Sequence, residues 1–266
     1  MRDLAQHLTQ SKARRQPLRQ FNRLFRRALP VSAFVAILMM PLSATAEIKS
    51  ARYLNPTDRY GHKVLGAEGE YTTLEVTLRG GKRLALAWED TVVFEDTAPR
   101  LVDLDGDGAP EVIAVQSHQN GGAQVAVYQF KDGKLSPMVS NPFIGTRFRW
   151  LAVVGAADLD GDGHMEIAYV DRPHLAKTLR ILRFKQEGDK SYSLTPVAQR
   201  SGVTNHRIGQ DYISGGIRDC GKGPEMIVAD ANWRNILSVT FDGKTTEVKR
   251  LGPFTGRSSI TAATSC

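Results

Sequence analysis

The chain has 266 residues and a formal net charge of +7, and this length corresponds to one or two domains. The positive charge lies in the first 46 residues, which hold eight basic residues and one acidic residue, so residues 47–266 hold 27 of each and are formally neutral. A nucleic-acid-binding domain needs its basic excess in the folded part, so this balance argues against a nucleic-acid partner.

Residues 1–46 have the three parts of a secretory signal peptide. Basic residues dominate positions 1–28, an apolar run follows at 29–42, and residues 44–46 (Ala-Thr-Ala) form a small-residue cleavage point. The alternative is an uncleaved membrane anchor, but the apolar run has ~14 residues and a span needs ~20. We therefore expect a periplasmic or secreted protein with no stable membrane span after the leader is removed.

Short strands are predicted from residue 71 onwards. Residues 71–78 (YTTLEVTL), 83–87 and 92–94 are rich in alternating or β-branched apolar side chains, and Gly80-Gly81 provides a turn between the first two segments. This pattern indicates a set of hairpin strands.

Two nearly identical acidic segments follow. Residues 103–111 read DLDGDGAPE and residues 158–166 read DLDGDGHME, 55 residues further on. Each segment has a short apolar stretch before it and an unbroken apolar run after it, at 111–115 and 166–170. Strands on both sides make each acidic segment a hairpin connection.

An alternating strand then completes each copy, with QVAVYQF at 124–130 and TLRILRF at 178–184. A third copy with altered chemistry covers residues 215–230 (GGIRDCGKGPEMIVAD), followed by a strand at 236–241 and an Asp242-Gly243 turn. Its register relative to the first two copies slips by about one residue. Of the acidic residues only Asp219 and Glu225 remain, beside Arg218 and Lys222, so we expect this copy to keep the scaffold and to have lost the ion.

Four units of ~50 residues thus cover residues 47–266, and no helical periodicity is sustained after residue 46. Regularly spaced short strands with turn signals are typical of all-β folds, and repeats of this length are typical of propellers. The sequence therefore predicts one all-β domain at 47–266, a small β-propeller of about four blades.

The acidic segments predict calcium sites, because Ca²⁺ takes six to eight hard oxygen ligands and alternate positions of a tight loop point inward. A backbone carbonyl near position seven and a closing glutamate complete each set. The predicted ligands are Asp103, Asp105, Asp107, Ala109 and Glu111 in one loop, and Asp158, Asp160, Asp162, His164 and Glu166 in the other.

Three other interpretations of these loops are less favoured. An EF-hand requires a glutamate at position 12, which is Ala114 in one loop and Tyr169 in the other. Zinc is disfavoured because neither loop contains cysteine and His164 is the only histidine in them. A solvated acidic turn is the remaining alternative. The presence of two copies with matching flanks argues against it.

These segments resemble the FG-GAP/VCBS repeat family, whose cation-binding loop is DxDxDGxx(D/E), over roughly residues 95–250. The resemblance implies a β-propeller, of the type seen in integrin α-chains, in which each ion braces the turn between two strands of a blade. It also implies an exported bacterial protein. Propellers of the family typically have more blades than this chain has room for. The chain could therefore form either a small propeller or an incomplete ring that another chain completes.

Two cysteines, Cys220 and Cys266, lie after the leader. An even cysteine count in an exported chain favours one disulfide, and the alternative is two unpaired thiols.

The leading functional hypothesis is an exported binding module for an unidentified protein or carbohydrate, with calcium in a structural role. Two alternatives are a subunit of an envelope complex and a periplasmic propeller enzyme, a hydrolase or lyase with an axial site, although no catalytic motif supports the enzyme. The polar loops at residues 59–62 and 205–209 are the first candidates for a ligand surface on one rim. The segment RFRW at 147–150 is interpreted as a strand with an exposed basic side.

Overall fold

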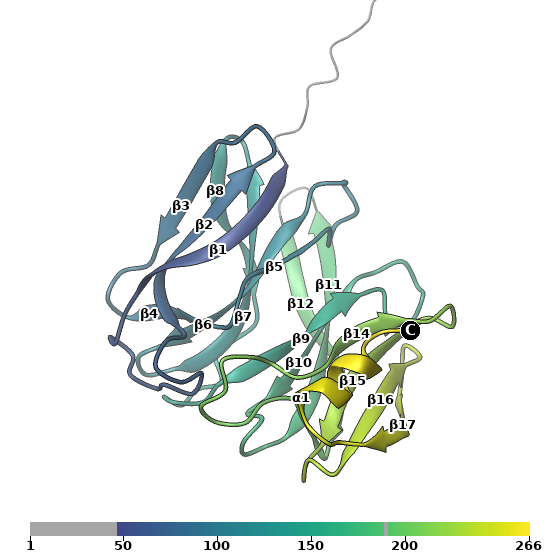
Figure 1. Ribbon diagram of the computed structural model, residues 1–266. Coiled ribbons are helices and arrows are strands. Elements are labelled where there is room, and N and C mark those ends of the chain that lie inside the picture. Colours follow the sequence, from purple (N-terminus) through teal and green to yellow (C-terminus); the bar gives the residue numbers. More distant parts are fainter. Residues whose placement is uncertain (1–46, 189–190) are drawn as a thin grey trace, which may run out of the picture. The chain divides into compact units, whose positions relative to one another are not determined.

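The computed structural model describes residues 47–188 and 191–266, in which antiparallel strands are accompanied by one short helix (Figure 1). The all-β class predicted from the sequence is confirmed. The predicted signal peptide at residues 1–46 lies outside the described residues. Among the residues that the structure describes, no helix has the length and hydrophobicity needed to cross a membrane.

The first sheet has eight strands and contains two of the predicted units. Its hydrogen-bonded order is β1-β2-β4-β6-β7-β8, with β3 beside β2 and β5 beside β6. The bounds are β1 Ile48–Pro56, β2 Glu70–Leu78, β3 Arg83–Ala87, β4 Val92–Glu95, β5 Arg100–Val102, β6 Glu111–His118, β7 Gly122–Lys131 and β8 Lys134–Ser140.

The second sheet has the order β12-β11-β10-β9, and the third has the order β13-β15-β16-β17 with β14 beside β15. The second comprises β9 Leu151–Ala157, β10 Glu166–Asp171, β11 Thr178–Gly188 and β12 Ser191–Ser201. The third comprises β13 Val203–Thr204, β14 Gly216–Asp219, β15 Pro224–Asp230, β16 Asn235–Phe241 and β17 Thr246–Pro253.

The sequence predicts four units, whereas the described residues form three sheets. The difference arises at β4, which pairs with β2 through Tyr71 and Phe94 and with β6 through Val93 and Ser117. This short strand hydrogen-bonds on both sides and so joins the first two predicted units into one sheet.

Each sheet contains one four-stranded antiparallel meander, formed by β5–β8, β9–β12 and β14–β17. The first turn of the first two meanders is a predicted acidic loop, and the first turn of the third is the altered copy. The hairpin connections predicted around these loops are therefore confirmed.

The unbroken apolar runs exist because both faces of these strands are buried. In β10, Ile167 packs into the cluster shared by the first and second sheets, and Ala168 packs into the cluster shared by the second and third. The same alternation holds in β15, where Met226 faces the second sheet and Ile227 packs against the C-terminal helix. Full burial of such side chains contributes ~1.5–3 kcal/mol each.

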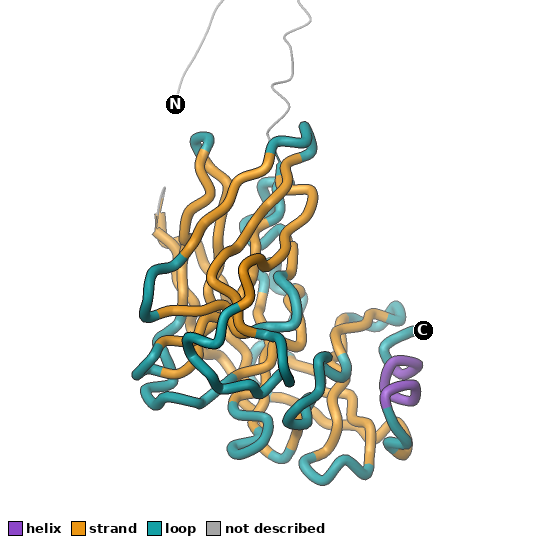
Figure 2. Tube along the Cα trace, turned by 60° about the vertical axis from the view of Figure 1, so that its left-hand side comes forward, coloured by secondary structure: helices purple, strands orange, loops and turns teal. Residues whose placement is uncertain are grey.

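Helix α1, Arg257–Ala263, covers the outer face of the third sheet, where its Ile260 is buried against Ile227 and Ala229 (Figure 2). The predicted disulfide between Cys220 and Cys266 is present. It links the segment that follows helix α1 to the turn between β14 and β15.

Candidate metal centre

The two acidic loops connect paired strands in the same register. Val102 pairs with Glu111 across β5 and β6, and Ala157 pairs with Glu166 across β9 and β10. Each pair leaves eight residues to form the loop, so the two loops begin and end at equivalent positions of their sheets.

The first aspartate of each loop folds the backbone around its own carboxylate. Asp103 accepts hydrogen bonds from the N–H groups of Gly106 at 2.8 Å and Gly108 at 3.0 Å. Asp158 accepts the same pair of bonds, at the same distances, from Gly161 and Gly163. These glycines have φ between 75° and 88°, a conformation that other residues adopt only with strain.

The closing glutamates are buried and are anchored to the core. Glu111 accepts the N–H of Leu104 at 2.8 Å, and Glu166 accepts the N–H of Leu159 at 2.9 Å. The side chains of both leucines are 4% exposed and belong to hydrophobic clusters. The backbone N–H of the leucine at the second position of each loop therefore holds the glutamate carboxylate, and the buried side chain of the same leucine anchors the loop to the core.

Three carboxylates converge in each loop. Ligand oxygens of Asp103, Asp105 and Glu111 lie within 4.8 Å of one another, as do those of Asp158, Asp160 and Glu166. These six residues belong to the predicted ligand set, and such a group of oxygens can hold a hard cation.

The remaining predicted ligands lie beside these groups and make turn contacts. Asp107 accepts the N–H of Ala109 at 2.8 Å, and Asp162 accepts the N–H of His164 at 2.9 Å. Both carboxylates are thus held at the turn, next to the three-residue groups.

The first loop is electrostatically unfavourable without a cation. Burial, reinforced by the charges of Asp105, Asp107 and Asp103, raises the pKa of Glu111 to about 7. Burial and the charge of Asp107 also raise the pKa of Asp105. Within the described residues no basic side chain forms an ion pair with this loop, and a cavity of about 260 Å³ adjoins Asp105, Asp107 and Glu111.

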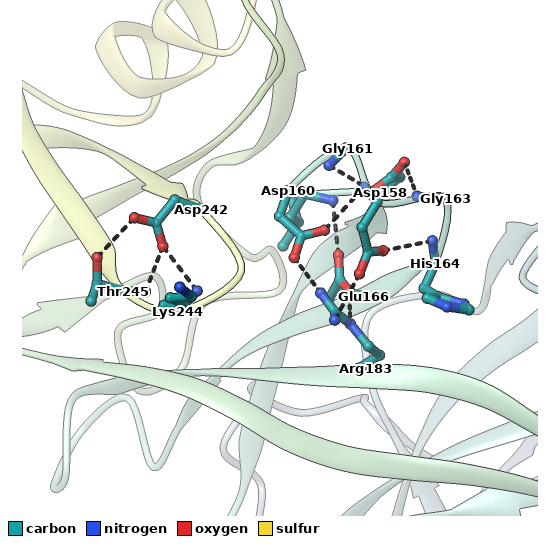
Figure 3. A network of polar contacts seen from close by, with 12 residues as sticks. Asp158, Asp160, Gly161, Gly163, His164, Glu166, Arg183, Asp242, Lys244 and Thr245 are labelled. Atoms are coloured by element: carbon teal, nitrogen blue, oxygen red, sulfur yellow. Dashed lines mark hydrogen bonds and ion pairs between the residues drawn. The ribbon is translucent and has the colours of Figure 1, made fainter.

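The second loop contains its own cation. The guanidinium of Arg183 forms ion pairs with Glu166 at 2.6 Å and with Asp160 (Figure 3). It forms a third ion pair with Asp162 at 2.8 Å. It therefore neutralises charge at the point where the carboxylates converge. A backbone hydrogen bond from His164, together with the Arg183 charge, lowers the pKa of Asp162.

Arg183 is the residue of this site that the sequence prediction missed. It lies on β11 opposite Glu166. The signal was present in the repeat itself, because aligning QVAVYQF with TLRILRF places Gln129 of the first copy at the position of Arg183 in the second. An uncharged side chain therefore accompanies the first loop, and a cation accompanies the second.

The third hairpin is shorter by two residues than the other two. Arg218 pairs with Glu225 at the position held by Val102 and Glu111 in the first copy, so six residues separate the pair. This register makes Asp219 the counterpart of Asp103, which corrects the slipped register expected from the sequence. Arg218 forms an ion pair with Glu225 at 2.7 Å, and the altered copy keeps the hairpin, as expected.

A comparison with known protein families agrees with this repeat structure. Residues 103–169, which contain both acidic loops, match the family described as FG-GAP-like repeat. No curated protein matches the chain significantly. The matched segment begins at the first acidic loop and ends within β10, after the second acidic loop. The resemblance inferred from the acidic segments is confirmed over these residues, which match an FG-GAP-like repeat.

Proposed function

We propose that this protein is an exported β-propeller-type binding module whose acidic hairpins are stabilised by calcium. The observation that carries the proposal is the repeated convergence of three carboxylates in loops of matching hydrogen-bond geometry. The FG-GAP-like repeat supports an interaction role, because such repeats are typical of propeller-like interaction modules.

Propeller-type packing is supported by the three meanders and the clusters between them. The second sheet packs one face on the first sheet and the other face on the third, as neighbouring blades do. We propose that the meanders are blades of an open or partner-completed ring, with helix α1 covering the outer face of the third.

Calcium is the proposed ion because all the converging groups are carboxylate oxygens. Hard oxygen ligands in a flexible loop favour calcium or magnesium over zinc, and calcium accepts the looser geometry. The raised pKa of Glu111 supports the same assignment, since a bound cation would offset the repulsion that causes it.

Export is supported by the leader pattern in the sequence and by the Cys220–Cys266 disulfide, because disulfides persist mainly in oxidising compartments. We propose the periplasm or the exterior as the location.

An enzyme is the second candidate, favoured by His62, whose ring Nδ1 is oriented by buried Glu95 at 2.7 Å. Ser117, however, donates its hydroxyl proton to Glu95 rather than to His62, so this pair lacks an activated nucleophile.

Metal analysis and thermal unfolding of the purified, leader-free protein test the calcium proposal. We expect bound calcium after purification, and a midpoint that rises with calcium and falls with chelator, because ligands that bind only the native state stabilise it. A midpoint that is the same in calcium and in chelator would reject the proposal.

A further inference from the structure

A second cavity, of about 370 Å³, lies away from the acidic loops. Arg172 and His174, which line it, follow the end of β10, whose first residue is Glu166. Six strand residues span roughly 20 Å, so the cavity and the second acidic loop lie at opposite ends of one strand. The cavity also brings together the two polar loops selected from the sequence, through His62 and Ile208, and Gly209 of the second loop donates its N–H to the carbonyl of Val64 at 2.9 Å.

The cavity gathers exposed apolar side chains that are otherwise rare among the described residues. Four large hydrophobic residues are exposed among those described, and Phe148 (38%), Leu175 (64%) and Ile208 (72%) all line it. The fourth, Val248, lies on β17 outside the cavity. Exposed apolar side chains gathered at one place mark a binding site more often than isolated ones do.

Two of the lining residues have a strained backbone. Phe148 has φ 57° and Arg172 has φ 46°, values that are unusual for bulky residues and that concentrate at functional sites. Phe148 is held in place by its N–H, which donates to the hydroxyl of Tyr60 at 2.7 Å, and by stacking on His62. The surrounding contacts therefore hold the apolar wall in position.

The deeper wall is fixed by hydrogen bonds between buried and half-buried groups. The ring of His174 contacts His206 at 2.9 Å, and His206 contacts the carbonyl of Gln210 at 2.8 Å. The indole N–H of Trp150 donates to the carbonyl of Glu95 at 2.8 Å. A wall held in this way needs little reordering to receive a ligand, which favours binding.

The charge of the cavity is positive. No acidic side chain lines it among the described residues. Arg172 is already paired with Asp171 at 2.8 Å, whereas the guanidinium of Arg149 donates only to the carbonyl of Phe148, at 3.1 Å, and forms no ion pair in the described part of the chain. Arg149 therefore offers a cation beside an apolar wall.

We propose that this cavity binds a small organic carboxylate with an aromatic or branched aliphatic body. Arg149 binds the carboxylate, and Phe148, Leu175 and Ile208 cover the apolar body. The cavity volume is at the lower end of the range for small-molecule sites. This inference goes beyond the proposed metal role and gives the binding module a ligand class.

Calorimetric titration of the calcium-treated, leader-free protein with N-acetyl-L-phenylalanine tests the proposal, with the neutral N-acetyl-L-phenylalanine amide as the matched probe. We expect the acid to bind at least about tenfold more tightly than the amide, and Arg149→Gln to remove this difference, because a hydrogen bond to a charged group contributes ~1.5 kcal/mol or more. Arg83→Gln, which removes the same charge from an exposed position on β3, leaves both affinities unchanged.

The apolar contacts have their own matched test. Leu175→Ser and Ile208→Ser each weaken binding of the acid several-fold, and Val248→Ser does not. The proposal is overturned if the acid does not bind up to its solubility limit, if acid and amide bind equally, or if Arg149→Gln and Arg83→Gln behave alike. Thermal unfolding of the same samples with calcium and with chelator tests the metal proposal separately. A midpoint that still rises with calcium would show that only the carboxylate proposal has failed.

Discussion

Gln129 and Arg183 occupy the same position in two copies of one repeat, each on the strand next to the glutamate that closes its acidic loop. Arg183 pairs directly with Glu166 in the β10–β11 register. Gln129 follows Tyr128, the partner of Val112, and therefore lies opposite Glu111. This difference gives the second loop an ion-paired guanidinium, whereas the charge of Lys131 acts on Asp105 of the first loop without forming an ion pair.

The first prediction concerns calcium affinity at the two loops. We expect the first loop to bind calcium more tightly than the second, because calcium must displace Arg183 from the second. Arg183→Gln should raise the affinity of the second loop at least about tenfold, since one charged contact is worth ~1.5 kcal/mol or more. Calorimetric calcium titration measures both affinities.

The reciprocal change, Gln129→Arg, is the matched control and should weaken calcium binding at the first loop. Equal affinities at the two loops of the unaltered protein, or no response to either substitution, would contradict the assignment of Arg183 as an internal cation.

The second prediction concerns the stability that calcium supplies. Asp105→Asn should abolish most of the calcium-dependent rise of the melting midpoint, because it removes one of the three converging carboxylates of the loop that has no ion pair. Asp219→Asn should leave the rise intact, since among the described residues the Asp219 carboxylate accepts one hydrogen bond, from the N–H of Gly221. Melting curves with and without chelator compare the two variants. A similar loss of the calcium-dependent rise in both variants would count against the metal site.

The third prediction concerns the disulfide. Cys220→Ser combined with Cys266→Ser should lower the free energy of unfolding by ~3–4 kcal/mol in the chain-entropy description, because the bond closes a loop with a sequence separation of 46. Urea unfolding of the oxidised protein and the double variant measures the loss. Adding reductant should lower the free energy of unfolding of the unaltered protein to that of the double variant, and it should leave the free energy of unfolding of the variant unchanged.

The fourth prediction concerns pH. Burial, with the nearby His206, lowers the pKa of His174 from 6.5 to about 4. Protons then bind the unfolded chain in preference to the folded one, so His174 contributes stability that is present above about pH 6.5 and is lost as the pH falls towards 4. His174→Gln should flatten this part of the stability profile, measured by urea unfolding across the interval. A variant with an unchanged slope would show that His174 is not buried in its neutral form.

The fifth prediction separates backbone conformation from close packing. Gly215 has φ 89°, and a Cβ added there would lie 1.9 Å from the carbonyl oxygen of Ile227, whereas Gly209 has φ 85° with open space around it. Gly209→Ala should therefore destabilise the protein by the conformational term alone, ~1–2 kcal/mol, and Gly215→Ala by clearly more. Thermal unfolding compares the two, and similar losses would contradict the close contact seen at Gly215.

The repeat pattern predicted the hairpins and the carboxylates because both depend on local sequence. The spacing of Asp103, Asp105 and Glu111 needs only the turn between two strands to bring these groups together. The pairing of β4 with both neighbours depends instead on contacts between distant segments, which periodicity does not report. Arg183 lies 17 residues beyond Glu166 in sequence and meets it only across the sheet, so it could be found only by aligning the copies.

The C-terminal helix was beyond prediction for a related reason, whereas the cavity was predicted in part, because two of the loops that line it, at residues 59–62 and 205–209, were the first candidates for a ligand surface. Helix α1 has seven residues, too few to show a period, and its position is set by burial of Ile260. Phe148, Leu175 and Ile208 come from three separate loops, and none of them is distinctive in its own segment. The strand expected at residues 147–150 is wrong, because these residues form the turn that precedes β9.

Because of the Cys220–Cys266 bond, the third hairpin is held differently from the other two, and each of the three hairpins has its own kind of stabilising interaction. The first has converging carboxylates with no ion pair among the described residues, the second has the guanidinium of Arg183, and the third has an ion pair at Arg218 together with a covalent link. Under the calcium proposal, a chelator would remove the ion from the acidic loops, salt would weaken the ion pairs of Arg183 by screening, and a reductant would break the covalent link at the third hairpin. The three hairpins are therefore expected to respond to different changes in the surroundings.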